Sequence, residues 1–119
     1  MIKGIGVDMV ELSGIKDLMN DKFIDHVLST EEKKMFENIP VEETKLSYIG
    51  GIFAAKEALF KALKSDKITG LYRDVSILQK ENGTSYIVSD LIDPSLNVHV
   101  TISHTDNYTV AFVVIENTK

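Results

Sequence analysis

The stretch from Phe53 to Ala62 combines strong helix formers with charged residues placed where they could do chemistry. Glu57 follows Phe53 by four residues and precedes Phe60 by three, so all three lie on one face of the predicted helix. Lys61 follows Glu57 by one helical turn. Two interpretations are open: an i,i+4 ion pair worth about 0.2–0.5 kcal/mol, or a carboxylate presented to a metal beside a lysine presented to an anion.

Three further polar residues stand at the ends of predicted strands. Asp8 follows an N-terminal strand, and Ser103 and His104 close a strand over residues 98–103. Asp8 could equally be a turn or N-cap residue, and His104 an ordinary surface histidine. Two carboxylates in a chain without cysteine would suit a hard cation such as Mg²⁺, because such sites use one or two carboxylates and complete the shell with water and phosphate oxygens.

Length and composition narrow the class of protein. The 119 residues predict a single domain, residues 1–119, with a core of its own. The absence of cysteine excludes disulfides and thiolate metal sites. No apolar run approaches the ~20 residues of a membrane span, and the N-terminus lacks the apolar segment of a signal peptide. A cytoplasmic protein without a membrane partner is therefore expected, and the net charge of −5 disfavours a general nucleic-acid binder.

The order of the predicted elements indicates an α+β fold, with helices first and strands last. After a strand at residues 2–8 and a short helix around Ile15, Ser29 and Glu32 form a capping box for a helix that ends before Pro40. The main helix, roughly residues 43–65, is apolar on more than one side, which is typical of a helix between layers or at a subunit interface. Strands are predicted at 75–78, 86–88, 98–103 and 108–115, the first two joined by an Asn-Gly turn.

Three motifs are spaced along nearly the whole chain. They read GIGVDMVEL at residues 4–12, FAAKEA at residues 53–58 followed by Lys61, and ISHT at residues 102–105 followed by an apolar strand that ends at Glu116. In these motifs and their order, the chain resembles the holo-acyl-carrier-protein synthases, the short bacterial class of 4′-phosphopantetheinyl transferases. The resemblance implies the fold of that family, a mostly antiparallel sheet packed with a long central helix.

The resemblance also implies a reaction. Family members transfer the 4′-phosphopantetheine arm of coenzyme A to a serine of an apo acyl carrier protein, a step of fatty acid biosynthesis, and release adenosine 3′,5′-bisphosphate. The residues matching Asp8 and Glu57 hold Mg²⁺, for which Mn²⁺ is an alternative. Short members form trimers with sites in clefts between protomers, so a homotrimer is expected.

Roles for the remaining motif residues follow from the same resemblance. Glu57, Lys61 and His104 are expected to be catalytic. Lys61 could stabilise charge on the leaving phosphate, and His104 could bind a phosphate or donate a hydrogen bond. The proton of the attacking serine could pass to Glu57 or to a water molecule on the metal. The residues expected to bind coenzyme A are Lys56, Lys61, Ser103 and His104.

The chain departs from the family pattern at a few positions. Gly14 and Ile52 stand where the family commonly has arginines, and of the usual glycine-threonine-glycine turn only Thr69-Gly70 is recognisable. An acidic enzyme needs a local basic patch to dock an acidic carrier protein, and Lys16 and Lys22 are the candidates. The departures favour one alternative, a non-catalytic protein that binds coenzyme A or a carrier protein on the same scaffold. A Mg²⁺-dependent hydrolase of nucleotide pyrophosphates is a more distant one.

Overall fold

The computed structural model describes residues 1–64 and 70–117, so most of the altered turn after the main helix, residues 65–69, lies outside the described part. The elements are, in order, β1 (Ile2–Glu11), α1 (Leu12–Leu18), α2 (Asp21–Val27), α3 (Thr30–Glu37), α4 (Glu42–Leu63), the 3-10 turn η1 (Tyr72–Asp74), β2 (Ser76–Gln79), β3 (Ser85–Val88), β4 (Leu96–His104) and β5 (Tyr108–Asn117). The predicted α+β class is confirmed.

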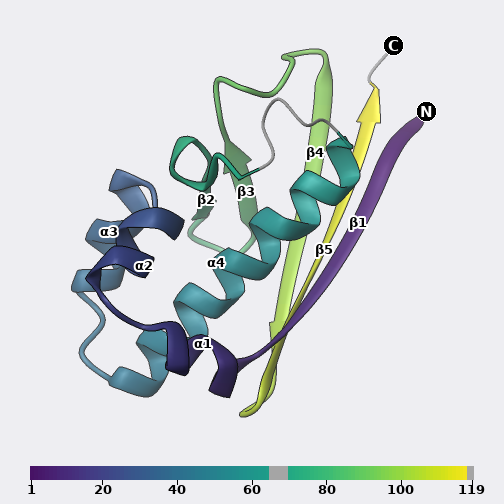
Figure 1. The fold of residues 1–119 in the computed structure, drawn as a ribbon. Helices are drawn as coiled ribbons and strands as arrows, with labels where there is room; N and C mark the ends of the chain where they lie inside the picture. The colour runs from purple at the N-terminus through teal and green to yellow at the C-terminus, as the bar shows by residue number, and fades with distance from the viewer. Residues whose placement is uncertain (65–69, 118–119) are drawn as a thin grey trace.

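An antiparallel three-stranded sheet in the order β1-β5-β4 forms the base of the molecule. The 22-residue helix α4 lies across one face of this sheet, with α1 to α3 beyond it, and the β2–β3 hairpin stands beside β4 (Figure 1). The two ends of the chain lie side by side, because the Asn117 N–H donates to the Met1 carbonyl at 2.9 Å. Within the described residues, no helix combines the length and hydropathy of a membrane span.

Two glycines let α4 lie directly on β1. A Cβ atom on Gly4 would lie 2.0 Å from the carbonyl oxygen of Ala62, and one on Gly6 would lie 2.0 Å from the carbonyl oxygen of Ala58. Any side chain at either position would therefore push the helix away. Because alternate residues of a strand share a face, Asp8 faces the same side of the sheet as the two glycines.

A buried ion pair joins the helices to the hairpin. The Lys56 ammonium, fully buried in α4, donates to Glu32 Oε1 at 2.6 Å, to the Val27 carbonyl at 2.8 Å and to the Tyr72 carbonyl at 2.6 Å. Burial lowers the pKa of Lys56, and the negative charge of Glu32 opposes that shift. Its three protons thus connect α4 to the end of α2, to α3 and to η1.

The capping box predicted at the start of α3 is confirmed, and its glutamate does more than cap. The Ser29 N–H donates to Glu32 Oε1 at 2.8 Å, and the Glu32 N–H donates to Ser29 Oγ at 3.3 Å. Glu32 Oε2 also accepts the N–H of Ile77 in β2 at 2.6 Å. One carboxylate therefore satisfies a helix end, a buried ammonium and a strand amide.

The other face of the sheet exposes apolar side chains. Val7 in β1 pairs with Phe112 in β5, and both are more than two-fifths exposed, as are Ile5 and Met9 on the same face of β1. We refer to these four residues, Ile5, Val7, Met9 and Phe112, as the outer sheet face. These side chains give the sheet an exposed apolar surface on the side away from α4.

Candidate active site

Asp8 lies inside β1 and is held by a lysine from α4. The sequence placed Asp8 just past the strand, with a turn or N-cap as the alternative, but β1 continues to Glu11, and Glu11 is the residue that precedes α1. Lys61 Nζ donates to Asp8 Oδ1 at 2.9 Å and to the Val7 carbonyl at 3.1 Å. The Asp8 side chain is 18% exposed and that of Lys61 is 56% exposed. Lys61 is thus a solvent-facing cation over a shielded carboxylate.

The i,i+4 ion pair between Glu57 and Lys61, one of the two interpretations of their spacing, is not formed within the described residues. Glu57 instead accepts a hydrogen bond from the Tyr72 phenol, with 3.0 Å between Tyr72 Oη and Glu57 Oε1. The Tyr72 ring stacks on Phe53 at 5.7 Å between centroids and meets Phe60 edge-on at 5.2 Å. The predicted shared face of Phe53, Glu57 and Phe60 is therefore the face on which Tyr72 packs.

The carboxylates of Glu57 and Asp8 both affect the pKa of the Tyr72 phenol. Burial raises the pKa of Tyr72 to about 12, and the hydrogen bond to Glu57 and the negative charges of Glu57 and Asp8 act in the same direction. Asp8, Glu57 and Lys61 therefore occupy one flank of α4, next to η1. Sequence reasoning does not find Tyr72, because it follows Glu57 by 15 residues across a turn and has no periodic relation to it.

The donor set on this flank fits a hard divalent cation. Within residues 1–64 and 70–117, each carboxylate keeps one oxygen, Asp8 Oδ2 and Glu57 Oε2, for which no hydrogen-bond donor is present. In the same residues, no group of three or more acidic or histidine side chains could hold a metal by itself. Two carboxylates with the remaining positions supplied by water and phosphate is the arrangement that Mg²⁺ commonly takes in proteins.

His104 ends β4, as predicted, but it lies on the opposite flank of α4. It lines an open hollow of about 600 Å³ together with Thr44, Ser47 and Gly51 of α4. At 3.6 residues per turn, Glu57 points about 120° away from Gly51 around the helix. Within one chain, His104 therefore lies apart from Asp8, Glu57 and Lys61.

Ser103 and Lys56 also lie apart from the carboxylates. Ser103 pairs with Val110 and His104 with Thr109, so the two residues point to opposite faces of the sheet. Lys56 is fully buried, and its three ammonium protons donate to three protein acceptors. Its geometry is that of a residue that holds α4 against η1, and it has no proton left for a bound ligand.

The two positions noted as departures, Gly14 and Ile52, have different surroundings in the structure. Ile52 is 3% exposed and lies in the core beneath the His104 hollow, whereas Gly14 is exposed in α1. Position 52 therefore contributes apolar packing to the core.

Comparison with known proteins assigns the class. Residues 4–113 match the 4′-phosphopantetheinyl transferase superfamily. A holo-acyl-carrier-protein synthase from Acholeplasma laidlawii is 45% identical over 116 residues, which is 98% of each chain. One from Geobacillus sp. is 42% identical over 123 aligned positions, again 98% of each chain. The chain belongs to the 4′-phosphopantetheinyl transferase superfamily.

Solved structures define its place within that class more closely. The holo-acyl-carrier-protein synthase of Bacillus anthracis, in complex with CoA (3′,5′-ADP), superposes with a TM-score of 0.89 at 29% identity over 99% of each chain. The Helicobacter pylori synthase in complex with coenzyme A gives a TM-score of 0.76 at 26% identity, over 94% of this chain and 99% of that one. The predicted fold and the predicted relationship to the holo-acyl-carrier-protein synthases are both confirmed, and with them the enzyme class.

Proposed function

We propose that this chain transfers the 4′-phosphopantetheine arm of coenzyme A to a serine of an apo acyl carrier protein in the cytoplasm. The observation that carries the proposal is the grouping of Asp8, Glu57 and Lys61 on one flank of α4. This grouping supplies what attack on a pyrophosphate needs, namely carboxylates for a cation and a separate cation for the leaving group. The relatives named as holo-acyl-carrier-protein synthases support the same reaction.

In the proposed step, the serine hydroxyl oxygen forms a bond to the phosphorus that carries pantetheine. The bond from this phosphorus to the bridging oxygen breaks, and adenosine 3′,5′-bisphosphate leaves. The serine proton passes to Glu57 or to a water molecule beside it. Asp8 and Glu57 would hold Mg²⁺, or Mn²⁺ in its place, which when bound reduces the charge repulsion between the phosphates and the nucleophile.

Lys61 is suited to the leaving phosphate because its ammonium lies beside the carboxylates and its side chain is exposed to solvent. Its ammonium nitrogen lies 2.9 Å from Asp8 Oδ1, and more than half of its side chain is exposed. With Asp8 paired to a second cation, the Lys61 ammonium would be available to phosphate oxygens without leaving the Asp8 carboxylate unpaired. As a compact point charge it can follow the phosphate as negative charge develops there.

We further propose that the protein acts as a homotrimer whose sites lie between copies. The outer sheet face offers apolar area for self-association. The separation of His104 from Asp8 and Glu57 within one chain favours a site completed by a neighbouring copy, in which His104 would meet coenzyme A. Val7→Glu should yield monomers in sedimentation and lower transfer, whereas a wild-type protein that sediments as a monomer would contradict this assembly.

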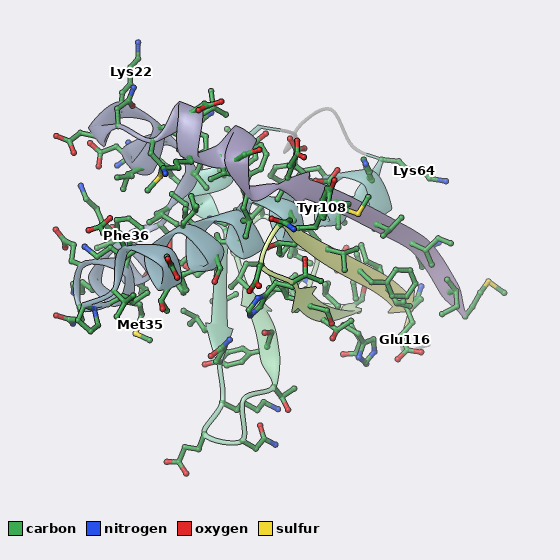
Figure 2. All side chains as sticks on the ribbon, turned by 90° about the horizontal axis from the view of Figure 1, so that it is seen from below. Lys22, Met35, Phe36, Lys64, Tyr108 and Glu116 are labelled. Atoms are coloured by element: carbon green, nitrogen blue, oxygen red, sulfur yellow. The ribbon has the colours of Figure 1, made fainter. Side chains whose placement is uncertain are left out.

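Carrier docking is proposed at the helical end, through Lys16 and Lys22. Both are exposed, and Lys22 points away from the body of the molecule (Figure 2). Because the chain carries a net charge of −5, attraction to an acidic carrier must be local and therefore screened by salt. Carrier affinity should fall as salt rises, and an affinity that stays flat or increases would contradict docking through these lysines.

The direct test is the intact mass of an apo acyl carrier protein after incubation with this protein, coenzyme A and Mg²⁺. Transfer predicts a gain of one phosphopantetheine on the carrier, dependent on the cation, with release of adenosine 3′,5′-bisphosphate. Binding of coenzyme A without any mass gain on several carriers would refute transfer and favour the binding-only alternative. Release of phosphopantetheine without a carrier would indicate the hydrolase.

A further inference from the structure

Tyr72 is a residue beside the site to which neither the sequence motifs nor the proposed mechanism gives a role. It is fixed at its backbone, its ring and its hydroxyl. The carbonyl of Tyr72 accepts the buried Lys56 ammonium at 2.6 Å, and the same ammonium is paired with Glu32. Its backbone position is therefore set by the most deeply buried charged pair in the described residues.

The ring of Tyr72 contacts three aromatic side chains. Phe53 stacks on it at 5.7 Å, Phe60 meets it edge-on at 5.2 Å, and His26 of α2 lies at 5.2 Å, all between ring centroids. With the backbone and the ring both held, the phenol oxygen has little freedom. It donates to Glu57 Oε1 at 3.0 Å.

We propose that Tyr72 is a positioning residue that holds the Glu57 carboxylate in the orientation needed to bind a divalent cation. The inference rests on the proposed function, in which Glu57 is one of two carboxylates that hold the cation. Tyr72 occupies Oε1 and leaves Oε2 for the cation, so the carboxylate does not have to be ordered when the ion arrives. Ordering a free glutamate side chain costs conformational entropy, and a neighbour that has already ordered it removes part of that cost from binding.

The two carboxylates differ in what holds them. Asp8 is held by Lys61, a side chain that is 56% exposed and can leave when a cation arrives. Glu57 is held by the phenol of a half-buried tyrosine whose ring packs on three aromatic side chains, and this phenol can stay in place while a cation binds. Hydrogen-bond partners of ligating carboxylates typically matter by about 10–100-fold in metal affinity or activity.

Tyr72→Phe isolates the hydroxyl, because it keeps the ring contacts and the carbonyl that accepts from Lys56. Mn²⁺ binding, read from the electron paramagnetic resonance signal of the free ion in the presence of coenzyme A, should weaken about tenfold or more. The unfolding temperature should remain close to that of the wild type. The matched control is Tyr108→Phe at the start of β5, which removes a phenol that donates to Glu11 Oε2 at 3.4 Å. It should leave Mn²⁺ affinity unchanged.

Transfer assays separate positioning from packing and from the proposed function itself. Tyr72→Phe should raise the Mg²⁺ concentration for half-maximal transfer while changing the KM for coenzyme A little. In a Glu57→Ala background, the same change should have no further effect on Mn²⁺ affinity, because Tyr72 acts only through Glu57. If the wild type binds Mn²⁺ but transfers nothing, the proposed function fails while the Mn²⁺ comparison still decides the role of Tyr72.

Three results would overturn the proposal. They are Mn²⁺ affinity in Tyr72→Phe equal to or tighter than that of the wild type, a loss of affinity that persists in the Glu57→Ala background, and a wild-type protein that binds no Mn²⁺ with coenzyme A present.

Discussion

The close approach of β1 to α4 can be tested by one added methyl group. In Gly6→Ala, the new Cβ would lie 2.0 Å from the Ala58 carbonyl oxygen, where ordinary contacts begin near 3.4 Å. The strand and the helix must therefore separate by about 1.4 Å, the difference between these two distances. The obstructing atoms belong to helix backbone and cannot rotate aside, so the cost should reach the upper part of the usual 1–3 kcal/mol for overpacking, about 3 kcal/mol.

Two measurements report this separation. The unfolding temperature should fall by about 10 °C, since each kcal/mol moves the midpoint of a domain of this size by about 3–4 °C. At a temperature where the variant is still folded, phosphopantetheine transfer should also fall, by about tenfold or more. Asp8 lies two residues beyond Gly6 on the same face and moves with the strand, and misplacement by about 1 Å can cost up to 100-fold in rate.

The matched control is the same substitution at an open position. Gly14 lies in α1, and a Cβ there would meet nothing within 4 Å. Gly14→Ala should therefore raise stability by about 0.5–1 kcal/mol, because alanine is the better helix former. The reasoning is refuted if Gly6→Ala melts at the wild-type temperature, or if the two substitutions shift the melting temperature in the same direction.

Three further predictions concern buried or half-buried polar groups. Lys56→Met should destabilise the protein by about 3–5 kcal/mol in urea titration, because it leaves the Glu32 carboxylate buried without its cation; a loss under 1 kcal/mol would mean that the pair is unimportant. Thr109→Val should be neutral or raise stability by about 1 kcal/mol, since Thr109 Oγ1 is buried and has no hydrogen-bond partner within the described residues; a clear loss in calorimetry would point to a missing partner. The raised pKa of Tyr72, about 12, favours the neutral phenol in the folded state, so its contribution to stability should be complete below about pH 10 and be lost as pH rises toward 12. Ultraviolet titration should show this high transition in the wild type but not in Tyr72→Phe, and an unchanged titration curve would contradict the assignment.

Elements that are marked by a local sequence signal, such as a cap, a turn or a long helical pattern, were predicted well. The Ser29–Glu32 capping box, the Asn-Gly turn with Gly83 at φ +87° and the long helix at residues 42–63 all appear as expected. The helix α2 was not predicted, although Asn20 caps it by accepting the Phe23 N–H at 2.8 Å. The signal was present in the sequence, because Phe23, Ile24 and Val27 follow helical spacing behind this cap.

Long-range partners were beyond sequence reasoning. The spacing of Glu57 and Lys61 favoured a pair within the helix, but the glycines of β1 bring Asp8 close enough to take Lys61 instead. Likewise, Glu32 could be identified as a cap, while its pairing with Lys56 joins residues 24 positions apart. Local pattern identifies candidate residues, and only the packing of α4 on β1 decides which of them meet.

The central claim, that Asp8 and Glu57 hold the cation for transfer, is tested most directly by Glu57→Gln at saturating Mg²⁺. The variant keeps the size of the side chain and an oxygen for the Tyr72 phenol, but it removes the negative charge. Glu42→Gln, in the first turn of the same helix, is the control. We predict a loss of carrier modification by at least about 100-fold in Glu57→Gln and near-wild-type rates in Glu42→Gln. Turnover of Glu57→Gln close to that of the wild type would contradict the account.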